Sequence, residues 1–228
     1  MSVNLNQIIP FGRSRREYEL MFNLTDTDRR GRILGCGDGP ASFNAEMTAL
    51  GHSVISIDPI YAFSGPQIEQ QFNATVDDVI GQIKATPENW TWSYHQNSED
   101  LRRHRCQVMQ QFLADYDRGL AAARYRIAAL PDLPFTTAEF DLALCSHLLF
   151  LYSDLLSEAF HLASVLELCR VASEVRIFPL LTLNLKFSPY VEPIRRKLSE
   201  NGFETEIAQV AYELQKGGNK MLRIFQPE

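Results

Sequence analysis

Three short apolar runs along the chain are separated by glycine-rich turns and amphipathic stretches. The first run enters a glycine cluster, the second is rich in β-branched residues and stops at an Asp-Pro pair, and the third stops at Ser146-His147. Strands of a buried parallel sheet are apolar on both faces, so they read as uninterrupted runs of this kind. The runs therefore predict parallel strands at residues 32–35, 53–57 and 141–145.

A helix is predicted between the first two strands, over residues 40–51. Pro40 suits a first helical turn, where an amide would be unpaired, and Gly51 supplies a left-handed stop. Downstream, the same patterns predict helices at residues 155–170 and 190–201 and strands at residues 125–130, 174–178, 205–212 and 221–225. The last two strands flank a glycine turn, as in an antiparallel hairpin. Repeated βα units followed by a hairpin predict an α/β fold with a doubly wound, mostly parallel sheet.

One segment, residues 62–124, is too long for a simple connection. Its apolar positions recur at helical spacing in two halves, which meet at a polar bend with two tryptophans, residues 87–99. We expect a helical insertion after the second strand, and few apolar positions to hold the bend in place. Insertions at the carboxyl edge of such a sheet lie beside the ligand crevice. The segment is therefore either a cap over the active site or a pair of stabilising helices, within a single domain of residues 1–228.

Composition narrows the classes of protein. Lys and Arg number 22 against 28 Asp and Glu, a formal net charge of −6, which argues against a nucleic-acid binder because phosphates require a basic face. No stretch approaches the ~18 apolar residues that span a membrane, and the start does not resemble a secretion signal. The four cysteines form no CxxC pair and no ligand spacing with a histidine. We expect free thiols, a cytoplasmic protein and no metal.

The glycine cluster at residues 35–39 is the motif that carries chemistry. It follows a strand and opens a helix, and Asp58 ends the next strand about twenty residues later, where a carboxylate can accept both ribose hydroxyls. A dinucleotide would place a pyrophosphate at the helix start, which Asp38 and Pro40 both oppose. S-adenosylmethionine has a sulfonium and an amino acid instead of phosphates. The loop therefore favours S-adenosylmethionine as the cofactor.

The segments ILGCGDG, SVISIDPIY and LPDLPFTTAEFDLALCSH resemble, in this order, the class I S-adenosylmethionine-dependent methyltransferases. The resemblance is closest to uncharacterised bacterial methyltransferase-like proteins with an ILGCGDGPASFNAE segment. It implies a Rossmann-like, seven-stranded sheet whose last strand is antiparallel, and methyl transfer to a small-molecule acceptor.

The same resemblance assigns roles to site residues. The backbone of Gly35, Cys36 and Gly37 would run beside the methionine moiety. Asp58 would hold the ribose, with Pro59 and Ile60 bordering the adenine. The adenine amino group would face Leu130-Pro131, and the methyl group would lie above Ser146-His147.

Two further residues have open roles. Arg13 can pair with the cofactor's carboxylate or remain a solvated arginine at a helix start. His147 can take a proton from the acceptor or serve only in packing. Two other functions are also open at this stage: an NAD(P)-linked oxidoreductase, and a regulatory module that binds an adenosyl cofactor without catalysis.

Overall fold

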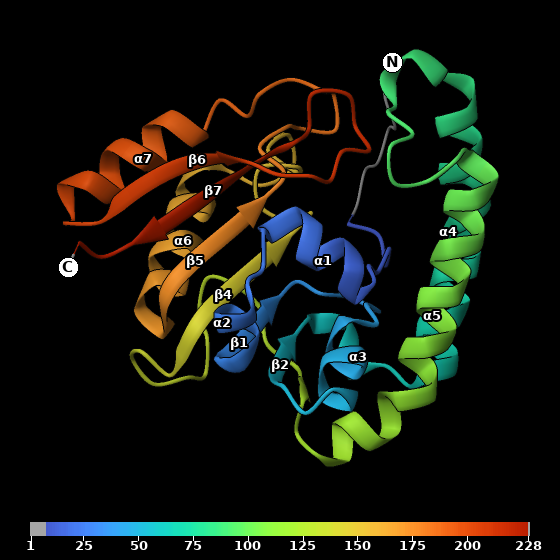
Figure 1. Ribbon diagram of the computed structural model, residues 1–228, viewed down its shortest axis with the longest axis horizontal. Coiled ribbons are helices and arrows are strands. Elements are labelled where there is room, and N and C mark those ends of the chain that lie inside the picture. The colour runs from blue at the N-terminus through green and yellow to red at the C-terminus, as the bar shows by residue number, and fades with distance from the viewer. Residues whose placement is uncertain (1–7, 228) are drawn as a thin grey trace.

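The computed structural model describes residues 8–227, which form one mixed sheet with helices on both faces (Figure 1). The strand order is β3-β2-β1-β4-β5-β7-β6, with β7 antiparallel to both of its neighbours and parallel pairing elsewhere. The strands are β1 (Arg32–Cys36), β2 (Ser53–Ile57), β3 (Tyr125–Arg126), β4 (Phe140–Ser146), β5 (Ala172–Phe178), β6 (Glu204–Gln209) and β7 (Lys220–Phe225). This is the Rossmann-like, seven-stranded α/β fold predicted from the sequence.

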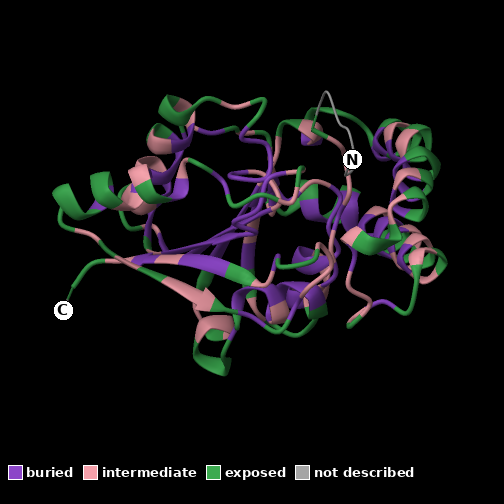
Figure 2. Ribbon diagram, turned by 90° about the horizontal axis from the view of Figure 1, so that it is seen from above, coloured by how far each residue is buried: buried purple, intermediate pink, exposed green. Residues whose placement is uncertain are grey.

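The two faces of the sheet bury alternate residues of each apolar run. In β1, Ile33 packs with α1 (Arg15–Phe22) and α3 (Phe43–Ala49), whereas Leu34 packs on the opposite face with α6 (Glu158–Val171) and α7 (Val191–Glu200). Figure 2 shows the resulting buried centre between exposed helix surfaces. Burial on both faces explains why these strands read as uninterrupted apolar runs.

Several predicted elements have other bounds in the structure: the strand expected over residues 205–212 ends at Gln209, and the helix expected over residues 155–170 begins at Glu158. The strand expected over residues 125–130 stops at Arg126, because the chain then turns through a bridge between Ala129 and Asp132. The helix α3 begins at Phe43 instead of Pro40. The prediction for Pro40 was wrong because the residues before Phe43 are held by contacts with the N-terminal segment, which local sequence does not reveal. Gly51 has φ +83°, as expected of a helix stop.

The insertion consists of two long helices that pack against each other at one side of the molecule, α4 (Gly65–Ala85) and α5 (Ser98–Ala121) (Figure 1). Their facing residues form a core of their own, which includes Val76, Ile80 and Phe112. The helical prediction for this segment is therefore correct. Two short helical elements lie outside the insertion, α2 (Asp26–Arg30) and the 3-10 turn η1 (Pro59–Ala62).

The bend of the insertion, residues 87–99, is more firmly held than its sequence indicates. It starts with the 3-10 turn η2 (Pro87–Asn89), and Trp90 is only 9% exposed. The Thr91 amide donates to the Leu214 carbonyl over 2.8 Å, and the Lys216 amide donates to the Asn89 carbonyl over 2.9 Å. The expectation that little holds the bend was wrong, because its contacts come from the C-terminal loop, residues 210–219.

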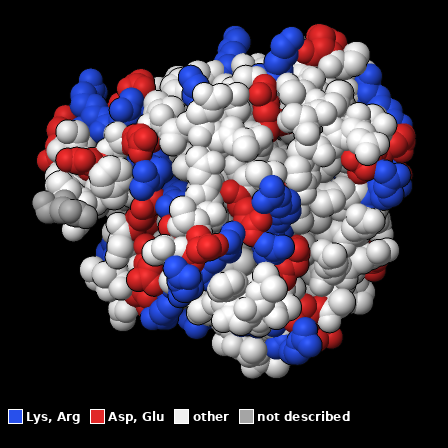
Figure 3. Space-filling view, in the orientation of Figure 1, with Lys and Arg blue, Asp and Glu red and all other residues white. Residues whose placement is uncertain are grey.

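Acidic and basic side chains intermingle on the face of the molecule shown in Figure 3, without a broad basic region. Among residues 8–227, no helix is both long enough and apolar enough to cross a membrane. Within the same described part of the chain, no three His, Cys, Asp or Glu side chains gather into a possible metal site.

Candidate functional site

The glycine loop lies at the carboxyl end of β1. Gly37 and Gly39 have φ of +67° and +54°, in the left-handed region that favours glycine. A Cβ on Gly37 would also come within 2.7 Å of Leu148 Cδ2. Glycine at position 37 is therefore needed both for the turn and for the close approach of the segment that follows β4.

Asp38 lines a cavity over the carboxyl ends of β1 and β2, but it is only 6% exposed and its carboxylate is held by neighbouring side chains. Its carboxylate accepts hydrogen bonds from Tyr18 Oη at 2.7 Å and Ser56 Oγ at 2.6 Å, and a Cβ on Gly35 would overlap it. Burial raises the pKa of Asp38 to about 7. Asp38 therefore repels a pyrophosphate less than the sequence indicates, because this carboxyl group is only partly ionised near neutral pH.

The N-terminal arm, residues 8–14, instead covers the start of α3. The Ser42 amide donates to the Arg13 carbonyl over 3.1 Å, and a Cβ on Gly12 would come within 2.6 Å of the Ala41 amide nitrogen. Amides at a helix start are what a pyrophosphate needs. Since the arm occupies this position, the structure disfavours a dinucleotide for a reason that the sequence did not reveal.

Close packing of the arm depends on Gly12, where a Cβ would overlap the backbone carbonyl of Pro40. We expect Gly12→Ala to lower the free energy of unfolding by about 1–3 kcal/mol, since two backbones would have to separate. The control is Gly81→Ala, at an open helical position, where alanine should stabilise by about 0.5–1 kcal/mol. Urea unfolding of both variants and of the wild type tests this. A free energy of unfolding of Gly12→Ala equal to that of the wild type would contradict the packing of the arm on the glycine loop.

Asp58 lies at the end of β2 and connects two loops. It accepts hydrogen bonds from the Gly39 amide at 2.9 Å and from the Ile60 amide at 2.8 Å. Burial raises the pKa of this carboxyl group. Each of its oxygens retains a lone pair for a further donor, so Asp58 can hold a diol while it fixes the loops around it.

A cavity of about 1240 Å³, partly open to solvent, lies over the carboxyl ends of β1 and β2. Of the residues predicted for the site, those lining the cavity are Arg13, Cys36, Gly37, Asp58, Pro59, Ile60, Leu130, Ser146 and His147. Gly35 and Pro131 are not part of the lining: Gly35 is within β1, and Pro131 follows Leu130. Sequence reasoning missed Phe63, Gln71 and Phe160, which carry no local signal of a site.

Arg13 is a cation without a carboxylate partner among the described residues. Its Nη1 donates to the Phe11 carbonyl, whereas its Nε is buried and has no hydrogen-bond partner. Burial and the neighbouring charge of Arg105 lower the pKa of Arg13 to about 10. The group therefore remains charged at neutral pH and is available to an anionic ligand.

His147 stands where the strand β4 ends. It adopts φ +55°, its amide donates to the Phe178 carbonyl over 2.7 Å, and its Nδ1 lies 2.9 Å from Ser146 Oγ. Burial, with the positive charges of Arg13 and Arg105, holds the pKa of His147 well below its usual value. The imidazole is therefore neutral and able to accept a hydrogen bond.

A second cavity adjoins the first, and its empty space, which includes a part open to solvent, is about 760 Å³. The two share Ile9, Phe11, Arg13 and His147 in their linings. The remaining walls come from α4, the bend, α5, the segments after β4 and β5, and the C-terminal loop. Nothing in the local sequence pattern indicated this cavity, because its walls come from segments that lie far apart in the chain.

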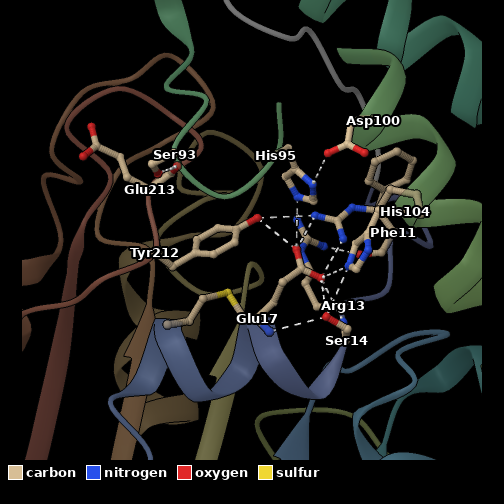
Figure 4. A network of polar contacts seen from close by, with 12 residues as sticks. Phe11, Arg13, Ser14, Glu17, Ser93, His95, Asp100, His104, Tyr212 and Glu213 are labelled. Carbon is tan, nitrogen blue, oxygen red and sulfur yellow. Dashed lines mark hydrogen bonds and ion pairs between the residues drawn. The ribbon is translucent and has the colours of Figure 1, made fainter. Parts of the chain in front are cut away.

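A buried ionic cluster, shown in Figure 4, includes Arg105 and Tyr212 of the second cavity's lining. Glu17 of α1 accepts two hydrogen bonds from Arg105 of α5, at 2.7 and 2.9 Å, and one from Tyr212 Oη at 3.0 Å. Nε2 of His104 lies 3.1 Å from Glu17, and Nε2 of His95 lies 3.6 Å from it. Despite burial, these neighbours hold the pKa of Glu17 well below its usual value. The cluster thus joins the N-terminal helix, the insertion and the C-terminal loop.

The fold, with its reversed β7 and a glycine loop at the end of β1, is the one that the resemblance to class I methyltransferases implies. The chain belongs to one family with the uncharacterised protein MJ0045 of Methanocaldococcus jannaschii, to which it is 30% identical over 223 residues, 97% of this chain and 98% of that protein. No family model matches the chain. Since this relative is archaeal, the affinity to bacterial proteins with an ILGCGDGPASFNAE segment stays a prediction.

Solved structures resemble the chain at low identity. Magnesium protoporphyrin IX methyltransferase from Synechocystis PCC 6803, with bound SAM, is 14% identical, with a TM-score of 0.46 over 89% of this chain and 73% of that chain. The PH0226 protein from Pyrococcus horikoshii OT3 is 12% identical, with a TM-score of 0.48 over 94% and 91%. A SAM-dependent methyltransferase from Aquifex aeolicus is 12% identical, with a TM-score of 0.41 over 86% and 81%. Similarity at this level does not transfer an activity.

Proposed function

We propose that the protein transfers the methyl group of S-adenosylmethionine to a small-molecule acceptor. The observation that carries this proposal is the N-terminal arm at the start of α3, where the Arg13 carbonyl takes the Ser42 amide. The glycine loop and Asp58 can bind an adenosine, which dinucleotides and S-adenosylmethionine both contain. The N-terminal arm, however, covers the start of α3, where the pyrophosphate of a dinucleotide would bind. An adenosyl ligand without phosphates fits the cavity that remains.

The larger cavity would hold the cofactor along the edge of the sheet. Asp58 would accept the ribose hydroxyls, with Pro59 and Ile60 beside the adenine. The peptide at Leu130-Pro131 would face the adenine amino group, although Leu130 alone reaches the cavity lining. The backbone of Gly35, Cys36 and Gly37 would pass the amino-acid end. Arg13 lines both cavities, so a carboxylate bound to it can come from the cofactor or from the acceptor.

The acceptor would lie in the second cavity, and His147 stands where the two cavities meet. When bound, the cofactor supplies an electrophilic methyl group on a sulfonium, and the displaced sulfur keeps the electron pair of the broken C–S bond. The neutral His147 imidazole would receive the acceptor's proton, and Ser146 Oγ would orient the ring through Nδ1. Most of the acceleration would come from holding donor and acceptor in line.

The insertion would act as a cap over the acceptor. Val79 and Ile83 of α4, Trp90 of the bend and Leu101 of α5 line the second cavity, opposite the C-terminal loop. Hydrogen bonds join the bend to this loop, and residues of both line the cavity. With an acceptor bound, this mostly apolar lining would exclude water from the transfer.

The formation of S-adenosylhomocysteine from S-adenosylmethionine, in the presence of small apolar acceptors, tests the proposal. We expect acceptor-dependent product that falls about 100-fold in His147→Ala, while cofactor binding remains close to wild type. Tight binding of S-adenosylhomocysteine with no turnover on any acceptor would contradict enzymatic transfer and would support a non-catalytic binding module.

A further inference from the structure

The lining of the second cavity has an unusual balance of charge. It contains Arg13 and Arg105 but no aspartate or glutamate, and most of the other lining residues are apolar. Arg105 is only 1% exposed, so its guanidinium is an interior group. A buried cation requires an anionic partner, since removal from water is costly for an isolated charge.

Only one of these two cations has such a partner within the described chain. Glu17, behind the cavity wall, binds Arg105 through both carboxylate oxygens. His95 and His147 add no further positive charge, because burial lowers the pKa values of both and keeps their rings neutral. One positive charge, that of Arg13, is left over at the cavity wall.

Each of these two arginines also has a hydrogen-bond donor that no acceptor among the described residues satisfies. The Nε atoms of both Arg13 and Arg105 are buried without a partner. Both arginines line the apolar cavity, and buried polar groups are nearly always hydrogen-bonded, so the unpaired donors favour an anionic ligand that the guanidinium groups would turn to meet. Guanidinium groups pair best with planar oxyanions, and above all with carboxylates.

We propose that the methyl acceptor is a small, mainly apolar molecule with one carboxylate, which binds in the second cavity with that carboxylate on Arg13. This proposal rests on the proposed function, because it takes the larger cavity as the cofactor site. The apolar body would pack against Trp90, Leu101 and Phe178. The cofactor also has a carboxylate, so the experiment must separate the two sources.

Three ligands of one shape test the proposal: 3-phenylpropionate, 3-phenylpropan-1-ol and 3-phenylpropan-1-amine. The chain has two tryptophans, and Trp90 lines the cavity whereas Trp92 does not. In a Trp92→Phe background, Trp90 fluorescence therefore reports occupation of this cavity. We expect the carboxylate to bind at least tenfold more tightly than the alcohol or the amine, a difference of about 1.4 kcal/mol.

Arg13→Gln should reduce the affinity for 3-phenylpropionate about tenfold, to that of the alcohol, since only the charge and the fork of donors are lost. The matched control is Arg16→Gln, on an exposed arginine in the first turn of α1 that does not line either cavity, and it should leave the affinity unchanged. Melting curves of both variants show whether they fold. Equal binding of the three ligands, preference for the amine, or no binding of 3-phenylpropionate would overturn the proposal.

Saturating S-adenosylhomocysteine separates the two sources of a carboxylate. Unchanged or stronger binding of 3-phenylpropionate in its presence is expected if the carboxylate belongs to the acceptor. Competition between the two would assign Arg13 to the cofactor and overturn this proposal while leaving the proposed function intact. Failure of S-adenosylhomocysteine to bind would instead contradict the proposed function itself.

Discussion

Asp58→Ala is expected to weaken the binding of S-adenosylhomocysteine by about 10- to 150-fold, or about 1.5–3 kcal/mol. The variant removes the carboxylate that would accept both ribose hydroxyls. It also frees the amides of Gly39 and Ile60, which Asp58 fixes at 2.9 and 2.8 Å. Isothermal titration calorimetry of the variant and the wild type provides the comparison.

Asp132→Ala is the matched control for Asp58→Ala. Asp132 is an exposed aspartate next to the Leu130-Pro131 peptide, and it does not line the larger cavity. Its removal should leave the dissociation constant unchanged. If Asp58→Ala also left it unchanged, the ribose would have to be held elsewhere, and the assignment of Asp58 would be wrong.

Glu17→Gln is expected to lower the free energy of unfolding by about 3–5 kcal/mol, because it breaks a buried pair and leaves a charge without a partner. Arg105 would lose its counter-ion, and Arg13 already lacks one. Urea unfolding at pH 7 measures the loss. In the exposed control Glu88→Gln, the change should remain within about 0.5 kcal/mol.

The pH dependence of stability supplies an independent check on Glu17. Its pKa is well below the usual value in the folded protein, so its ionised form contributes stability above the unfolded pKa. This contribution should fade as the pH falls below the unfolded value of about 4.3, towards the folded pKa. Glu17→Gln should lack that part of the acid dependence. An unchanged acid profile would show that the Arg105 pair does not stabilise the fold.

Local patterns in the sequence were sufficient for the sheet and for much of the candidate cofactor site. The strands β1, β2 and β4 are buried on both faces, and their sequences are accordingly apolar throughout. The glycine loop and Asp58 could be placed because each comes directly after the end of a strand. The lengths of α4 and α5 are visible in their apolar periodicity. These features depend on neighbours in sequence, which explains why they could be predicted.

Contacts between distant segments could not be predicted in the same way. Glu17 and Tyr212 are 195 residues apart in sequence and share a hydrogen bond, and Gly12 packs on the backbone of Pro40. Such pairs have no repeating pattern in the sequence. Contacts between distant segments cover the start of α3 and anchor the bend. They also form the entire second cavity. The role of Pro40 was misjudged for the same reason.

The most direct test of the account is a calorimetric titration of the wild-type protein with S-adenosylhomocysteine, NAD and NADP under identical conditions. The account predicts one site for S-adenosylhomocysteine with a dissociation constant in the micromolar range, near −8 kcal/mol, and no measurable binding of either dinucleotide. Binding of NAD or NADP with comparable affinity would show that the N-terminal arm does not exclude a pyrophosphate, and it would contradict the assignment of the larger cavity to S-adenosylmethionine.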